Sequence, residues 1–273
     1  MPNSKDEVKY TPPSLNRIIA EINKKAGENV IGRVPNMGTL EIERLSTGLP
    51  VLDDALGGGF PTKRIAELYG LPGVGKSLIA LLVIKEIQKK GGECIYLDVE
   101  DSFDPDWART LGVDTDKLVI SQSSVGEDTL ELVAKLLRAE PDVIVVDSVA
   151  AMVTRAELEE PIEKAFMAPK ARLMSKALAI LNSINKKTLI IFINQLRNTM
   201  AMYGPQFTTP GGQALKFYSS IRIEVKKGED IHQDDKKTQP IIGQTVGFRI
   251  TKNKTAAPFR SGAFRLYHDG RIE

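Results

Sequence analysis

The hydrophobic and polar positions of this chain follow two different periods, and each period predicts one kind of element. Some short runs are apolar at almost every position, whereas the stretches between them carry apolar residues three or four positions apart. The first pattern is typical of buried strands and the second of amphipathic helices. The predicted strands are 64–69, 94–99, 118–121, 143–147, 188–194 and 221–225, and the predicted helices are 78–87, 104–111, 128–138 and 170–184.

Strands that are apolar throughout and alternate with helices are typical of a mostly parallel sheet covered by helices on both faces. The pattern therefore predicts an α/β fold for most of the chain. Segment 46–61 is expected to form a capped short helix that leads into the first of these strands. The last part of the chain differs, because 245–251 and 263–267 alternate in a β-like manner on either side of Lys252 and Lys254.

The N-terminal part predicts a separate short helix. Leu15, Ile18, Ile19 and Ile22 are spaced i, i+3, i+4, i+7, and Gly27 ends the pattern. A polar segment with Gly and Pro follows, so we place a boundary between 1–38 and 39–273. A helix with one apolar stripe must bury that stripe. On this pattern alone, the helix can dock equally well on the core of its own chain or on a neighbouring subunit.

Composition narrows the class of protein. The chain has 273 residues, of which 42% are hydrophobic and 26% charged, with a net charge of +2, two histidines and one cysteine. These values fit an ordinary soluble protein in a reducing cytoplasm, without disulfides and without a zinc site. No apolar run approaches the roughly 18 residues of a membrane span, so we expect no membrane contact. The small net charge means that any nucleic-acid binding must come from local patches.

The strongest motif is GLPGVGKS, which begins at Gly70 and satisfies the G-x-x-x-x-G-K-[ST] pattern between a predicted strand and a predicted helix. In that context backbone N–H groups close around a triphosphate at a helix N-terminus, the lysine reaches the β and γ phosphates, and the hydroxyl ligates Mg²⁺. The motif predicts ATP and Mg²⁺ as ligands. The residues predicted to hold them are Gly70, Pro72, Gly73, Val74, Gly75, Lys76, Ser77 and Leu78.

Polar residues at three strand ends are expected beside this loop, because ligands of parallel sheets lie at the carboxyl ends of strands. Asp147 follows VIVV and can hold Mg²⁺ through water. Glu100 can orient and deprotonate the water that attacks the γ-phosphate, although with Asp98 and Asp101 it can also form a merely solvated strand end. Gln195 ends the third strand. Trp107 can stack on a base or pack as core, and its position leaves both open.

Two long segments, about 154–169 and 196–212, fit neither a strand nor a helix. Each follows a strand end and mixes basic, aromatic and small residues, which suits the neutralisation of phosphates and the stacking of bases in a single strand. Several glutamates in the first segment argue against this interpretation. The bare residues leave nucleic-acid binding open.

Taken together, these motifs resemble the RecA-type DNA strand-exchange recombinases of bacteria and their phages. The resemblance extends over roughly 14–271. Besides the glycine loop it rests on STG at 46–48, LGGG at 56–59, VIVVDSVAA at 143–151, FINQ at 192–195, GGQALKFY at 211–218, KNK at 252–254 and AAPF at 256–259.

The resemblance implies a P-loop NTPase core of RecA type with a short N-terminal helix that docks on a neighbouring subunit. It implies Glu100 as the water-activating glutamate and Gln195 as the γ-phosphate sensor. Lys252 and Lys254 are similar to the lysines that reach the ATP of an adjacent subunit, and their i, i+2 spacing places both on one face of a strand. Asp104 and Trp107 are similar to the adenine platform, and Tyr267 to a residue that covers the base.

By the same resemblance the two long segments are DNA-binding loops. The residues expected to contact DNA are Met167, Arg172, Arg197, Met200, Tyr203, Gly211 and Gly212. This chain departs from the family's pattern where Phe207 places an aromatic side chain in a usually polar part of the second loop. The separate C-terminal domain that is usual in bacterial relatives is also not expected here, since the sequence stops at Glu273.

The implied function is an ATP-dependent recombinase, a DNA-dependent ATPase that forms filaments on single-stranded DNA and pairs it with homologous double-stranded DNA. A regulatory ATPase or a ring motor with the same fold is the alternative, and it would lack strand exchange. A nucleotide-binding structural protein without turnover is disfavoured by Glu100.

Overall fold

The computed structural model describes residues 13–33, 42–159, 168–198, 207–235 and 238–273. Its contacts divide the chain into an N-terminal unit, Met1–Ile42, and a larger unit, Glu43–Glu273. In the N-terminal unit, helix α1 (Leu15–Ala26) begins at Ser14, whose side chain caps the Arg17 N–H, and ends at Gly27 with a φ of 75°. Leu15, Ile18 and Ile22 are exposed, so the predicted amphipathic helix is present and its apolar stripe is accessible.

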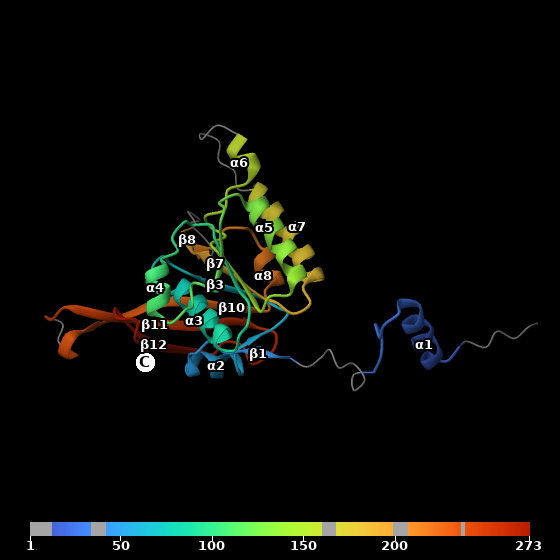
Figure 1. Cartoon of the computed structure of the whole chain (residues 1–273), viewed down its shortest axis with the longest axis horizontal. Helices are drawn as coiled ribbons and strands as arrows, with labels where there is room; N and C mark the ends of the chain where they lie inside the picture. The colour runs from blue at the N-terminus through green and yellow to red at the C-terminus, as the bar shows by residue number, and fades with distance from the viewer. Residues whose placement is uncertain (1–12, 34–41, 160–167, 199–206, 236–237) are drawn as a thin grey trace, which may run out of the picture. The chain divides into compact units, whose positions relative to one another are not determined.

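The larger unit is built on an eight-stranded sheet of order β12-β11-β10-β3-β7-β6-β4-β5 (Figure 1). Its strands are β3 (Ile65–Gly70), β4 (Cys94–Asp98), β5 (Val119–Gln122), β6 (Val143–Asp147), β7 (Leu189–Gln195), β10 (Ile221–His232), β11 (Ile241–Asn253) and β12 (Ser261–Tyr267). The six strands from β10 to β5 in this order pair in parallel. β11 pairs antiparallel with both of its neighbours, β10 and β12. The predicted mostly parallel sheet is confirmed.

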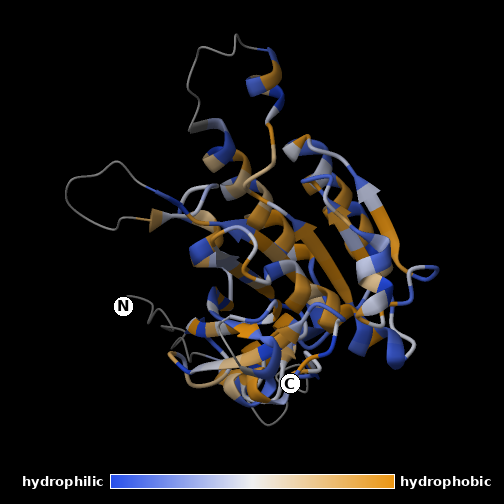
Figure 2. Ribbon diagram, turned by 90° about the vertical axis from the view of Figure 1, so that its left-hand side faces the viewer, coloured by the Kyte–Doolittle hydropathy of each residue, from blue (hydrophilic) through white to orange (hydrophobic). Residues whose placement is uncertain are grey.

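Helices cover both faces of the sheet, as the apolar strands predict. They are α2 (Pro50–Leu56), α3 (Lys76–Lys89), α4 (Pro105–Thr110), α5 (Gly126–Leu136), α7 (Ala168–Ile184) and α8 (Ala214–Tyr218). Alternate residues of β6 enter different cores: Val143 and Val145 join the cluster with α3, while Ile144 and Val146 join the cluster with α5 and α7. Figure 2 shows the resulting hydrophobic strands between helices.

Two strands near the C-terminus run further than the sequence pattern predicts. β10 and β11 continue past the apolar positions as a long hairpin, which extends away from the sheet in Figure 1. The pattern missed this because 226–230 in β10 carry only charged residues and glycine and are exposed, and their pairing with β11 is what makes them a strand. Cys94 is buried in β4, and its burial raises the pKa of the thiol to about 12.

The two long segments are more structured than predicted. The first contains helix α6 (Arg155–Glu159) and the start of α7, and the second contains the short antiparallel pair β8 (Arg197–Asn198) and β9 (Phe207–Thr208). Helix α6 begins at a capping box, in which the Glu157 carboxylate accepts from the Thr154 N–H and the Glu157 N–H donates to the Thr154 hydroxyl. This T-x-x-E signal was readable in the sequence.

Short elements complete the described structure. β1 (Arg44–Leu45) pairs with β2 (Phe60–Pro61), and single 3₁₀ turns follow α5 at Leu137–Ala139 and β10 at Gln233–Asp235. Among the helices within the described ranges, none is long and apolar enough to cross a membrane.

Candidate functional site

The glycine loop joins β3 to α3, as its sequence predicts. Gly73 and Gly75 have φ values of 71° and 98°, which residues with a side chain rarely adopt. A Cβ at Gly70 would lie 2.2 Å from the Val225 carbonyl oxygen, so the loop also needs glycine where it leaves the sheet. The loop therefore presents bare backbone at the N-terminus of a buried helix, the arrangement that binds phosphate.

Lys76 lies across this loop. Its Nζ donates to the Leu71 carbonyl oxygen at 2.6 Å, and the residue is buried. Burial lowers the pKa of the ammonium, while the nearby carboxylates of Asp147 and Glu100 raise it. Among the described residues this buried ammonium has a neutral carbonyl as its one hydrogen-bond partner, which suits it to bind an anion, so the loop fits a phosphate group.

Asp147 and Ser77 meet at the end of β6. One carboxylate oxygen, Oδ2 of Asp147, accepts from the Ser77 hydroxyl at 2.6 Å and from the Tyr96 hydroxyl at 2.6 Å. Burial raises the pKa of this carboxyl, and the two hydrogen bonds lower it in part. A hydroxyl beside a carboxylate is the donor set that Mg²⁺ prefers, so these two predicted ligands fit the ion. Tyr96 was not predicted, since an aromatic residue inside an apolar strand gives no polar signal.

Glu100 and Gln195 form the third part of the site. Gln195 donates from Nε2 to Oε1 of Glu100 at 2.7 Å. Gln195 pairs with Gly70 in the sheet register, and the Glu100 N–H donates to the Asp147 carbonyl at 3.2 Å. The structure thus brings the glycine loop, Asp147, Glu100 and Gln195 together at the carboxyl ends of the parallel strands. Glu100 is exposed, so its carboxylate is accessible to water and to a ligand.

The residues expected around the base have contacts within the fold. Asp104 caps α4 by accepting from the N–H groups of Asp106 and Trp107, and half-buried Trp107 packs against the core cluster. Tyr267 is buried, donates to Glu273 at 2.9 Å and lies under the guanidinium of Arg271. Their proposed contact with adenine stays a prediction.

Lys252 and Lys254 differ in their burial and in their place relative to strand β11. Half-buried Lys252 donates from Nζ to the carbonyls of Lys216 and Phe217, at 2.6 and 3.0 Å, at the end of α8. β11 ends at Asn253, so the expectation that Lys252 and Lys254 share one strand is wrong. The strand ends there because the Asn253 side chain accepts from the N–H groups of Thr255 and Ala256, an Asx turn that leaves Lys254 in the bend beyond the strand.

The described parts of the second long segment contact residues that flank the first, just before it and at the start of α7. Arg172 and Arg197 are exposed, and Arg197 donates to the Ala150 carbonyl at 3.4 Å. Gly212 packs on Ala171 so closely that a Cβ would lie 2.9 Å from the Cβ of Ala171, and Gly211 packs on Val149 and Met174. The structure thus juxtaposes the predicted DNA-binding residues that it describes. Met167, Met200 and Tyr203 lie outside the described residues.

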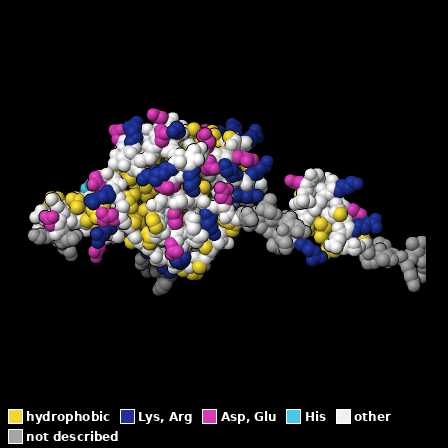
Figure 3. Space-filling model, turned by 60° about the horizontal axis from the view of Figure 1, so that its bottom comes forward, with side chains coloured by type: hydrophobic (Ala, Val, Ile, Leu, Met, Phe, Trp, Pro, Cys, Tyr) yellow, Lys and Arg dark blue, Asp and Glu magenta, His cyan; other side chains and the backbone are white. Residues whose placement is uncertain are grey.

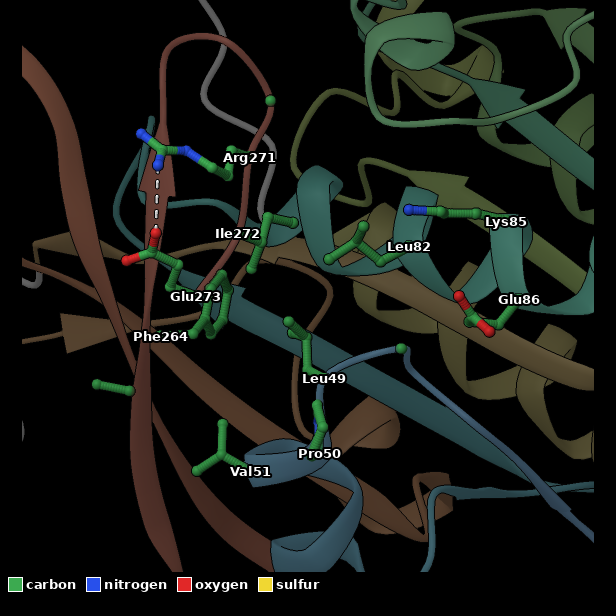
Figure 4. Close-up of a pocket in the computed structure, with 13 residues that line it drawn as sticks. Leu49, Pro50, Val51, Leu82, Lys85, Glu86, Phe264, Arg271, Ile272 and Glu273 are labelled. Carbon is green, nitrogen blue, oxygen red and sulfur yellow. Dashed lines mark hydrogen bonds and ion pairs between the residues drawn. The ribbon is translucent and has the colours of Figure 1, made fainter.

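A separate cavity of about 630 Å³ opens between α2, the last turns of α3 and the C-terminal residues (Figure 4). Leu49, Leu82, Phe264 and Ile272 line it, with Lys85, Glu86 and an ion pair of Arg271 and Glu273 around it. None of the predicted site residues lines this cavity, so it is distinct from the phosphate site.

Figure 3 shows basic and acidic side chains interspersed over the visible face of the larger unit.

Comparison with known proteins places this chain in a family. Residues 13–273 match the family model for the RecA N-terminal domain. Protein RecA of Clostridium acetobutylicum is 44% identical over 263 residues, which cover 94% of this chain and 74% of that protein. Protein RecA of Symbiobacterium thermophilum is also 44% identical, over 93% of this chain and 73% of its own, and that of Mycoplasma mycoides is 41% identical, over 99% and 79%.

Proposed function

Since the chain belongs to the RecA family, we propose that it is an ATP-dependent homologous recombinase. It forms filaments on single-stranded DNA and pairs that strand with homologous double-stranded DNA, hydrolysing ATP as it does so. The observation that carries this proposal is the hydrogen bond of Gln195 to Glu100, because it joins the candidate hydrolytic carboxylate to the root of the second DNA-binding segment.

ATP is held by the glycine loop in this proposal. The backbone of the loop and Lys76 bind the phosphates. Ser77 and Asp147 would hold Mg²⁺. The ion neutralises phosphate charge when bound. Lys76 exchanges its carbonyl partner at Leu71 for phosphate oxygens, a stronger, charge-assisted hydrogen bond.

Glu100 acts as the general base. Its carboxylate accepts a proton from the attacking water, and Gln195 holds that carboxylate in place. When the γ-phosphate is present, Gln195 has two competing acceptors, the phosphate and Glu100. A change of partner at Gln195 moves the first residues of the segment that begins at Leu196, and so ties DNA binding to the state of the nucleotide.

DNA is bound where the two long segments meet. The exposed guanidinium groups of Arg172 and Arg197 neutralise phosphates, and the close packing of Gly211 and Gly212 on Val149 and Ala171 brings the end of the second segment to the base of the first. Contacts of this kind read no base edges, so sequence recognition is left to pairing between the DNA strands.

Electron microscopy tests the assembly. With a slowly hydrolysed ATP analogue and single-stranded DNA, the protein should form helical filaments, and without DNA the filaments should be fewer and shorter. Closed rings of fixed subunit number under both conditions would instead indicate a ring motor.

A further inference from the structure

A buried carboxylate in the strand before the glycine loop has no role in the site described so far. Glu67 lies in β3 with no exposed surface, in a strand whose other residues are apolar or aromatic. An isolated buried carboxylate is unfavourable, so its partners indicate its purpose. Its Oε2 accepts from Nε of Arg222 at 2.5 Å, and its Oε1 accepts from Nδ2 of Asn194 at 3.2 Å.

Asn194 connects this carboxylate to both functional segments. The same Nδ2 donates to the Pro210 carbonyl at 3.1 Å, and Oδ1 accepts from the Gln195 N–H at 3.0 Å. Asn194 is fully buried, so both amide hydrogens and the oxygen have partners and the amide plane is fixed. One side chain thus fixes the backbone of Gln195, directly before the second DNA-binding segment, relative to Pro210, near the end of that segment.

Arg222 connects the carboxylate to the strands on the β11 side of β3. Its guanidinium lies 4.5 Å from the centre of the Tyr69 ring, and Tyr69 donates to the Thr251 hydroxyl at 3.0 Å. Thr251 in turn donates to the Arg222 carbonyl at 3.3 Å, and Arg222 is paired with Lys252 in the register of β10 and β11. The hydrogen-bonded cluster of Glu67, Asn194, Arg222, Tyr69 and Thr251 therefore spans β7, β3, β10 and β11.

We propose that Glu67 is a positioning residue that, through Asn194, couples the second DNA-binding segment to the nucleotide site. This inference rests on the proposed function. A shift of Pro210 when DNA binds is then transmitted through the Asn194 amide to the Gln195 backbone. Glu67 accepts a hydrogen bond from that amide and so fixes its orientation. The ion pair with Arg222 holds the Glu67 side chain in place.

The test measures coupling rather than activity. The dissociation constant of a labelled oligo(dT) is measured with and without a slowly hydrolysed ATP analogue, and the analogue's dissociation constant with and without oligo(dT). The two ratios must agree, because coupling between binding sites is reciprocal. In the unmodified protein we expect a ratio of roughly fivefold or more, the lower end of typical allosteric coupling. A defect confined to packing weakens binding equally with and without the second ligand, and leaves the ratio unchanged.

Asn194→Ala should reduce both ratios towards one, and it leaves the Glu67–Arg222 ion pair in place. Glu67→Gln should also reduce both ratios. Both Glu67 oxygens accept hydrogen bonds, so the amide group of a glutamine must face a donor, either the Asn194 amide or the Arg222 guanidinium. Asn185→Ala is the matched control, since Asn185 is another buried asparagine, whose Nδ2 donates to the Thr188 carbonyl at 2.8 Å, outside this cluster.

Full coupling in folded Asn194→Ala and Glu67→Gln, or an equal loss in Asn185→Ala, would overturn the inference while leaving the recombinase proposal intact. A ratio of one in the unmodified protein would overturn both. If Glu67→Gln does not fold, Asn194→Ala alone decides.

Discussion

Ser77 donates a hydrogen bond from Oγ to Oδ2 of Asp147 across 2.6 Å, although 70 positions separate the two residues in the chain. The same oxygen accepts from Tyr96, so a single carboxylate oxygen at the end of β6 joins the helix after the glycine loop to the neighbouring strand β4. This arrangement sets the geometry of the proposed Mg²⁺ site before any ligand binds.

Asp147→Asn should stabilise the nucleotide-free protein at pH 7. Burial raises the pKa of the Asp147 carboxyl above its ordinary value of 3.8, so the folded protein binds this proton more tightly than the unfolded chain does. The free energy of unfolding contributed by Asp147 therefore falls as the pH rises from about 3.8 through the folded-state pKa. Asparagine keeps an oxygen that can accept from both Ser77 and Tyr96 but carries no charge.

Urea unfolding of both proteins between pH 4 and 8 measures this difference, which should grow with pH. Exposed Asp116→Asn is the control and should show no such trend. An Asp147→Asn protein less stable than the unmodified one at pH 7 would show that the hydrogen bonds, and not the buried charge, dominate.

Glu100→Gln should bind ATP and assemble normally but hydrolyse ATP about two orders of magnitude more slowly, the usual effect of losing a general base. The amide remains able to accept from Gln195, so the geometry is kept. Asp101→Asn is the matched control, because Asp101 is the adjacent exposed carboxylate and bonds to Gln122 instead. A normal steady-state rate in Glu100→Gln would place the base elsewhere.

Arg172→Ala and Arg197→Ala should each flatten the salt dependence of oligo(dT) binding. Each phosphate contact contributes about 0.7 to the slope of log affinity against log salt for a single strand. Arg138→Ala, an exposed arginine beyond the far end of α5, should leave the slope as it was. Unchanged slopes in the first two variants would mean that these arginines do not contact the strand.

Lys254→Ala protein should bind ATP but hydrolyse it poorly, because this exposed lysine is proposed to reach the ATP of an adjacent subunit. Mixed with Glu100→Gln protein it should regain some turnover, since interfaces with one intact Glu100 and one intact Lys254 form only in the mixture. Lys254 is the cleaner choice, because Lys252 also binds the carbonyls at the end of α8. Continued inactivity at every mixing ratio, with co-assembly verified, would exclude a shared site.

The strands, the main helices and the phosphate loop could be predicted because local patterns determine them. The Val143–Asp147 strand is apolar up to its last residue, and such a run is typical of a strand buried in a parallel sheet. The glycine motif likewise needs only its own backbone and its two flanking elements to be recognised.

What depends on distant partners could not be predicted. Tyr96 faces Asp147 only because β4 and β6 are neighbours in the sheet, and Glu67 meets Arg222 only because β3 and β10 are neighbours. The end of β11 at Asn253 depends on a side chain turning back on its own backbone. The capping box at Thr154 is different, since its spacing was visible in the sequence.

The central claim, ATP-dependent strand exchange, is tested most directly by fluorescence transfer between a labelled single strand and a labelled homologous duplex. The protein should exchange the strands with ATP and Mg²⁺, and should not do so without ATP, with a heterologous duplex, or as Lys76→Ala. Lys89→Ala, which removes an exposed lysine at the other end of α3, should retain exchange. Filaments that form on single-stranded DNA and hydrolyse ATP, yet never exchange homologous strands, would contradict the account.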